Sequence, residues 1–99
     1  MIKRKRRPTP PGEILSEMFL KPHGITQQAF ANAIGVSRKH ISAIIHDRQR
    51  LEPEMAARFG RVLHNSTEFW LNLQRAVDVW DADEKLKRWK PEYTFNLHA

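Results

Sequence analysis

The feature that most constrains the fold of this chain is the segment 26–45, where two short helical patterns stand only a few residues apart. The apolar spacing predicts helices over about residues 27–34 and 38–46, with Gly35 in the left-handed position that ends the first. Small Ala31 lets the two helices cross closely. The expected N-caps are Thr26 and Ser37, and the residues expected to lock the crossing angle are Ile34, Val36, Ile41 and Ile44. This arrangement is typical of a helix-turn-helix.

Three further helices are predicted from the same apolar spacing. The first covers about residues 12–20, with Pro11 suited to its first turn and Pro22 ending it. Pro53 begins another, and the last covers about residues 68–80. Their apolar positions are Ile14, Leu15, Met18 and Phe19, then Met55, Ala56, Phe59, Val62 and Leu63, then Phe69, Trp70, Leu73, Ala76, Val77 and Trp80. We therefore expect an all-α bundle of five or six short helices.

The end of the chain has a different pattern. Residues 81–90 can prolong the last helix with Leu86 and Trp89 turned inward, but Pro91 stops any helix. Apolar and polar side chains then alternate over residues 93–97. This alternation predicts a short strand or an extended tail.

Net charge indicates the kind of partner. The 99-residue, 11.6 kDa chain has room for one modest core and carries a formal charge of +6, with an isoelectric point near 10.2. This surplus favours a polyanionic partner, such as nucleic acid or an anionic membrane. Residues 1–50 hold a net charge of +7 and residues 51–99 a net charge of −1. We therefore expect the surface that needs positive charge in the first half.

Much of that surplus lies in a basic arm, residues 1–10, which contains the run Lys3–Arg7 followed by prolines. Because like charges repel and the segment has almost nothing to bury, we expect it to be disordered. Three roles stay open for it: a solubilising charge run, contact with the minor groove or neighbouring phosphates, and a segment that folds on a protein partner. Each phosphate that it neutralises steepens the log–log salt dependence of binding by roughly 0.9.

Several classes of function are excluded by what the sequence lacks. It has no cysteine, which removes disulfides, thiolate zinc sites and cysteine nucleophiles. No histidine pair stands at metal-binding spacing beside a carboxylate, and no serine has a base at recognisable spacing, so we expect no metal, cofactor or enzyme activity. No apolar run approaches the ~20 residues of a membrane span, and no signal-peptide pattern is present. We expect a cytoplasmic protein without a membrane partner.

In a helix-turn-helix, the second helix inserts its N-terminal residues into the major groove of DNA. The residues expected to face base edges are therefore Ser37, Arg38, Lys39, Ser42 and Ala43. Arg38 and Lys39 are either base readers or phosphate clamps, and the frequency of Arg and Lys contacts to guanine favours at least one base reader. Gln27, in the first turn of the preceding helix, and His40 are expected to contact phosphates.

In this helix-turn-helix segment the chain resembles the lambda-repressor-like family of DNA-binding proteins, also called XRE or Cro/C1. Two further stretches make the resemblance more specific. These are PGEILSEMFL at residues 11–20 and STEFWLNLQ at residues 66–74, and both are similar to the HigA branch of the family. Members of that branch are antitoxins of type II toxin-antitoxin modules. The resemblance covers about residues 10–81. It implies a five-helix domain that represses its own operon as a two-fold dimer on a palindromic operator and binds a HigB ribonuclease toxin.

The resemblance also implies roles for individual residues. The positions that match the base-reading residues of the family are Ser37, Arg38, Lys39 and Ala43, and Gln27 matches a phosphate contact in the first turn. Arg48 and Arg50 match a loop that contacts phosphates. Ala43 departs from the family pattern, because many repressors carry a long polar side chain there. Alanine offers only a methyl contact to thymine.

The predicted helix over residues 68–80 carries more large apolar groups than one inward stripe needs. Since a chain this short has little core to hold them, either all of them pack inside one protomer or some form a two-fold dimer contact. An operator with two half-sites one DNA turn apart requires such a dimer. The resemblance favours the dimer, whose interface is predicted to contain Leu73, Val77 and Trp80.

The predicted organisation has three parts: a disordered basic arm over residues 1–10, a helix-turn-helix domain with a dimerisation helix over residues 11–81, and a C-terminal extension over residues 82–99. The leading hypothesis is a non-enzymatic, sequence-specific repressor and antitoxin of the HigA type, located at the bacterial nucleoid when it is bound to DNA. Two alternatives stay open. One is a stand-alone regulator without a toxin, and the other is an interaction module that sequesters a partner through the Trp-rich second half.

Overall fold

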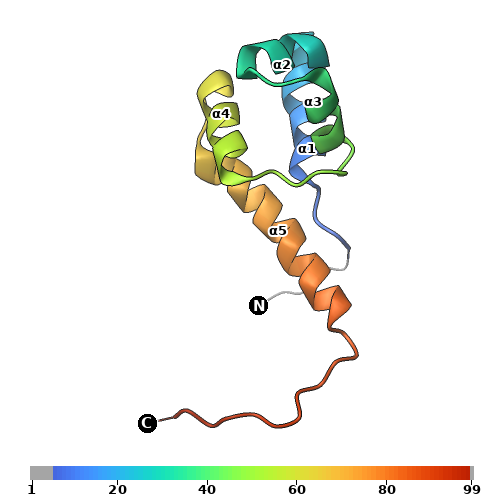
Figure 1. Cartoon of the computed structure of the whole chain (residues 1–99), viewed down its shortest axis with the longest axis vertical. Coiled ribbons are helices and arrows are strands. Elements are labelled where there is room, and N and C mark those ends of the chain that lie inside the picture. The colour runs from blue at the N-terminus through green and yellow to red at the C-terminus, as the bar shows by residue number, and fades with distance from the viewer. Residues whose placement is uncertain (1–5, 99) are drawn as a thin grey trace.

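Residues 6–98 are described by the computed structural model, and within that range the regular secondary structure is entirely helical. The elements are α1 (Pro11–Ile14), the π-helical η1 (Leu15–Leu20), the 3-10 turn η2 (Lys21–His23), α2 (Gln27–Ile34), α3 (Arg38–Ile45), α4 (Pro53–Leu63) and α5 (Thr67–Lys85). The first four α-helices cluster together, while α5 packs on α4 and then projects beyond the cluster (Figure 1). The prediction of an all-α, five-helix fold is confirmed.

The helix-turn-helix forms as predicted because its signals are local. The Thr26 hydroxyl oxygen accepts a hydrogen bond from the Ala29 amide at 3.0 Å, which begins α2, and the Ser37 hydroxyl oxygen accepts one from the His40 amide at 3.1 Å, which begins α3. Gly35 ends α2 at φ +84°, in the left-handed region that favours glycine. The caps and the turn therefore set where the two helices begin and cross.

The first helical segment differs from the prediction at its end. Its path does not stop at residue 20 but passes through η1, where the Lys21 amide donates to the Ser16 carbonyl five residues back, into η2. Pro22 does not terminate the helix, since it lies in the first turn of η2, where its missing N–H group is not needed. Gly24, at φ +64°, ends the segment instead.

The last helix is longer than predicted and the tail after it is extended. The Ser66 hydroxyl oxygen caps α5 by accepting from the Phe69 amide at 3.0 Å, and the helix runs to Lys85. The prediction that Leu86 and Trp89 turn inward is wrong, because their side chains are 51% and 61% exposed. The last turns of α5 lie beyond the helical cluster, so no core is available to receive these side chains (Figure 1).

Three aromatic rings in edge-to-face contact form the centre of the core. The ring of Trp70, on α5, lies 5.2 Å from that of Phe59, on α4, and the Phe59 ring lies 5.2 Å from that of Phe30, on α2. Both pairs are edge-to-face, a geometry worth ~0.5–1.5 kcal/mol beyond the area buried. Leu15, Leu20, Ala31, Ile34, Ile41, Ile44, Leu51 and Ala56 complete the cluster. This core joins the helix-turn-helix to α4 and α5.

Gly12 lets the backbone of α1 lie directly against the backbone at the end of α3. A Cβ atom at this buried position would lie 2.6 Å from the Ile44 carbonyl carbon and 2.7 Å from the Ile45 Cα atom. These atoms belong to the backbone, so they cannot move aside as the end of a flexible side chain can. Glycine therefore lets α1 support α3 from behind.

Candidate nucleic-acid interface

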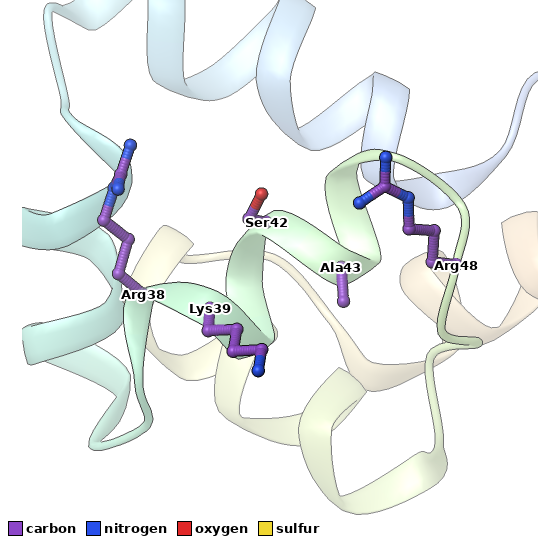
Figure 2. A pocket seen from close by; sticks show the side chains of 5 residues that line it. All are labelled: Arg38, Lys39, Ser42, Ala43 and Arg48. Carbon is purple, nitrogen blue, oxygen red and sulfur yellow. The ribbon is translucent and has the colours of Figure 1, made fainter.

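The outer face of α3 carries an open depression that gathers most of the predicted DNA-facing residues. Its lining consists of Arg38, Lys39, Ser42, Ala43 and Arg48. Arg38 and Lys39 extend from the first turn of α3, Ser42 and Ala43 come from the next turn, and Arg48 comes from the loop that follows (Figure 2). Four of the five residues predicted to face base edges thus lie together with one predicted phosphate contact.

The three cations of this depression are free to engage an anionic ligand. Within residues 6–98, Arg38, Lys39 and Arg48 form no ion pair, and all three are exposed. Arg48 follows Asp47, whose φ of +57° turns the chain sharply after α3. Guanidinium and ammonium groups donate several hydrogen bonds and accept none, which suits guanine edges and phosphate oxygens.

The remaining predicted contacts lie beside the depression rather than in it. The Ser37 hydroxyl oxygen already accepts a hydrogen bond as the cap of α3, and its proton can still donate. His40 is half-buried in the first turn of α3. Gln27 is also half-buried at the start of α2, and its Oε1 atom is buried without a hydrogen-bond partner among the described residues. The amide NH₂ end of Gln27 is the end that can donate to a phosphate.

Arg50 does not line this depression, and its predicted phosphate contact stays a prediction. Its guanidinium turns toward α5, where it binds both carboxylate oxygens of Asp78 at 2.6 and 3.0 Å and also binds Glu52 at 2.8 Å. The hydrogen bonds to Asp78 are the main cause of its raised pKa. The same Asp78 accepts from Gln74 at 3.0 Å, and Gln74 accepts from the Leu51 amide at 2.8 Å. This network ties the loop after α3 to α5.

Part of the basic arm is also held in place, so the prediction of disorder over residues 1–10 needs correction. Residues 1–5 lie outside the described part of the chain. Arg7 binds both carboxylate oxygens of Asp81 at 2.9 and 3.0 Å and binds Asp47 at 2.7 Å, and the neighbouring Pro8 is buried. The carboxylates that neutralise the charge of Arg7 lie 40 and 74 residues away along the sequence. No local sequence pattern could therefore identify them.

Acid pH is expected to release Arg7 from α5. The hydrogen bonds from Arg7 lower the pKa of Asp81, so the ion pair stabilises the folded chain above the ordinary aspartate pKa of about 3.9. This contribution is lost as the pH falls through the lowered value. We expect Asp81→Asn to be slightly less stable than the parent chain at pH 6 and to match it at strongly acid pH, as followed by thermal unfolding. Two curves that stay parallel over the whole range would contradict this.

The predicted dimer residues of α5 do not share one environment. Val77 is 1% exposed within the single chain, so its assignment to a dimer contact is wrong and it packs inside the protomer. Leu73 and Trp80 are only half-buried, and Phe69 and Val79 are 37% and 52% exposed. At 100° per residue, Phe69, Leu73 and Trp80 lie together on one flank of α5, beside the inward-facing Trp70 and Val77, whereas Val79 lies on the side opposite Trp70. We call Phe69, Leu73, Ala76 and Trp80 the outer stripe of α5.

Other kinds of site find no support in the described residues. Within residues 6–98, no group of three or more His, Asp or Glu side chains is placed to hold a metal ion. None of the helices in that range combines the length and apolarity needed to cross a membrane. The exposed cationic face of α3 is therefore the best-defined candidate site.

Comparison with known proteins agrees with this geometry. A family model described as helix-turn-helix matches residues 17–70. Antitoxin HigA-1 from Vibrio cholerae is 47% identical over 81 residues, which cover 82% of this chain and 76% of that protein. The chain belongs to the HigA branch of the helix-turn-helix family. An HTH-type transcriptional regulator from Escherichia coli, YbaQ, is 38% identical to this HigA-type chain over 82 residues, which cover 83% of it and 73% of YbaQ.

Solved structures of similar proteins include DNA complexes. Pseudomonas aeruginosa antitoxin HigA with the higBA promoter superposes on this HigA-type chain with a TM-score of 0.83 at 32% identity, covering 93% of this chain and all of that one. Antitoxin GraA in complex with its operator superposes with a TM-score of 0.76 at 35% identity, covering 95% of this chain and all of that one. The fold of this HigA-type chain is thus that of antitoxins that have been solved with their DNA.

Proposed function

We propose that this HigA-type protein is a sequence-specific DNA-binding repressor that acts as a two-fold dimer on a palindromic operator. The observation that carries the proposal is the exposed face of α3, where Arg38, Lys39 and Arg48 are free of ion pairs within residues 6–98. The promoter complex of Pseudomonas aeruginosa HigA and the operator complex of GraA support it. Repression then follows from occupation of the operator.

Individual side chains have separate roles in this proposal. Arg38 and Lys39 bind base edges in the major groove, with guanine as the preferred partner, and Ala43 offers a methyl group to thymine. Ser37 and Ser42 add hydroxyl donors to the same face. Phosphate contacts, which position the protein without reading sequence, come from Arg48, Gln27 and His40.

The dimer contact is proposed to lie on the outer stripe of α5. Phe69, Leu73, Ala76 and Trp80 are spaced four, three and four residues apart, which is the spacing that brings apolar side chains onto a helix–helix seam. All but the small Ala76 are large apolar groups, and the single protomer leaves them partly exposed. Pairing two such stripes around a two-fold axis buries this surface and places two copies of α3 for two half-sites.

Selection of bound sequences from random duplexes tests the repressor proposal. We expect a palindrome whose half-sites are centred about 10 base pairs, or one helical turn, apart. Because the two copies of α3 are related by a two-fold axis, the half-sites read the same sequence on opposite strands. Recovery of unrelated sequences, with binding that disappears at physiological salt, would instead indicate general attraction to DNA.

We further propose that the protein neutralises a HigB-type ribonuclease toxin. Its relationship to antitoxins HigA-1 and GraA supports this role. Co-expression with the product of a neighbouring gene should restore growth that this product alone arrests, and the two proteins should purify together. The relationship to the regulator YbaQ supports a second candidate, a repressor without a toxin, and this candidate predicts operator binding but no such rescue.

A further inference from the structure

The loop that follows α3, residues 46–52, presents Arg48 from an unfavourable backbone conformation (Figure 2). Arg48 lines the depression on α3 and comes directly after Asp47, whose φ of +57° lies in the left-handed region. A residue with a side chain adopts that region at a cost, so the surrounding structure has to hold the turn. One side of the turn is bonded to α3, because the Arg48 amide donates to the Ala43 carbonyl at 2.8 Å. The contacts that hold the rest of the loop therefore help to decide where Arg48 lies.

Those contacts come from α5, directly through Gln74 and by way of Arg7. The Gln74 Oε1 atom accepts a hydrogen bond from the Leu51 amide at 2.8 Å, and both residues are buried. Arg7 joins the Asp47 carboxylate, at 2.7 Å, to the Asp81 carboxylate, at 2.9 Å. The loop is thus fixed to α5 near both of its ends.

The residues of α5 that hold the loop share one flank of that helix. At 100° per residue, Gln74, Asp78 and Asp81 fall within about 60° of one another, and the inward-facing Trp70 and Val77 separate them from the outer stripe. Asp78 accepts a hydrogen bond from the Gln74 Nε2 atom at 3.0 Å, which fixes the direction of the Gln74 amide group. We call Gln74, Asp78 and Asp81 the polar ridge of α5.

We propose that the polar ridge positions Arg48 for its phosphate contact, so that α5 contributes to the affinity of the protein for DNA. This inference rests on the proposed function and adds to it residues that act through Arg48. Gln74 is central, because it is the only buried polar or charged side chain within residues 6–98. A buried amide without an acceptor is unfavourable, so removal of the Gln74 oxygen shifts the loop until water reaches the Leu51 amide.

Charge alone would give the acids of the polar ridge the opposite effect. A carboxylate close to DNA repels its phosphates, so neutralising an acid is expected to tighten binding. The proposal requires neutralisation of Asp81 to weaken binding, since Arg7 then loses its anchor on α5. The two effects differ in sign, and a binding measurement separates them.

The salt dependence of DNA binding tests the proposal. Each phosphate contact contributes roughly 0.9 to the slope of log affinity against log salt concentration. We expect Gln74→Leu to lower this slope by roughly 0.9 per bound protomer, as Arg48→Ala does, and to lower affinity roughly tenfold. The matched control Asn72→Leu places leucine on an exposed position of α5 and should change neither quantity. Fluorescence anisotropy titrations are run where circular dichroism shows each variant to be folded.

Combining the substitutions shows whether Gln74 acts through Arg48. In the Gln74→Leu background, Arg48→Ala should lower the slope no further, because the contact is already lost. A variant that is only less stable binds DNA with the parent slope when it is folded. Additive changes in slope overturn the proposal, and so does a slope that Arg48→Ala leaves unchanged in the parent chain.

A second pair of variants tests the polar ridge without touching the core. Since exposed ion pairs contribute little, we expect Asp81→Asn to lower affinity for DNA by only roughly two- to fivefold. Asp83→Asn removes the same charge from a carboxylate that forms no ion pair among the described residues, and it should bind at least as tightly as the parent chain. If Asp81→Asn binds as tightly as Asp83→Asn, the proposal is wrong, even where Gln74→Leu does not fold.

Two further results separate this inference from the proposed function. Phosphates are common to all duplexes, so Gln74→Leu should lower the slope on a scrambled duplex as well as on the operator. A lowered slope in a chain that selects no operator supports the polar ridge and removes the proposed repressor. Selection of a palindromic operator with a slope that Gln74→Leu leaves unchanged keeps the repressor and overturns the polar ridge.

The dimer provides the last control. The polar ridge and the outer stripe lie on different flanks of α5, so sedimentation equilibrium should give the same dimer dissociation constant for Gln74→Leu and the parent chain. A dimer weakened in proportion to the loss of DNA binding would show that Gln74 acts through dimerisation, and it overturns the proposal.

Discussion

Arg38→Ala and Lys39→Ala are each expected to lower affinity for the selected operator by about 1–3 kcal/mol relative to random DNA, a loss of roughly 5- to 150-fold in discrimination. Both side chains are exposed on the first turn of α3 and form no ion pair within residues 6–98. Removing a base contact costs affinity only where the correct base is present. Gel-shift titrations on operator and scrambled duplexes of equal length measure the difference.

Three variants serve as controls for that measurement. Arg48→Ala and Gln27→Ala should weaken binding to both duplexes alike, because phosphates are common to all sequences. Arg50→Ala removes an arginine close by in sequence whose guanidinium is already held by Asp78, so DNA binding should change little. If Arg38→Ala and Lys39→Ala reduce binding to both duplexes equally, these residues are phosphate clamps and the assignment of base reading to them is wrong.

Gly12→Ala is expected to destabilise the fold by about 3 kcal/mol or more, because the added methyl group meets the backbone of Ile44 and Ile45 and forces α1 away from α3. For a domain of this size, that loss lowers the unfolding temperature by at least about 12 °C. Differential scanning calorimetry measures the shift. Since α1 supports α3 from behind, operator binding should fail at a correspondingly lower temperature.

Gly24→Ala is the matched control for this prediction. Gly24 has a φ of +64°, but no atom lies within 4 Å of the position where its Cβ would be. The variant therefore pays only the cost of a left-handed alanine, ~1–2 kcal/mol, without a steric clash. Equal destabilisation by Gly12→Ala and Gly24→Ala would show that the close approach of α1 to α3 is not what requires glycine at position 12.

The parts of the fold that could be predicted depend on capping and turn residues that act within about one helical turn of their own position. Thr26 and Ser37 cap helices three residues downstream, and Gly35 turns the chain directly after α2. The spacing of these signals places α3, and with it Arg38 and Lys39, on the outer face. Most of the residues that line the depression on α3 could therefore be brought together before any tertiary contact was known.

The features that the sequence did not predict depend on contacts between distant parts of the chain. Arg50 was assigned to phosphate from the family resemblance, and local sequence gave no sign that Asp78, 28 residues away, holds its guanidinium. Arg7 was placed in a disordered arm, although Asp81 holds it across 74 residues. Val77 and Trp80 are both apolar positions of one helix, and only the packing of α5 on α4 decides that Val77 faces inward.

Local sequence was enough to predict the helices, their caps, the helix-turn-helix and the side chains that α3 carries. Hydrogen bonds within a few residues and apolar periodicity are properties of the local chain. The tertiary structure decided which cations stay free for DNA and which are neutralised by α5, which face of α5 is left for a partner, and that the tail has no partner in its own protomer. Those outcomes depend on the direction in which α5 leaves the core. That direction is set by the burial of Trp70 and Val77 rather than by any local signal.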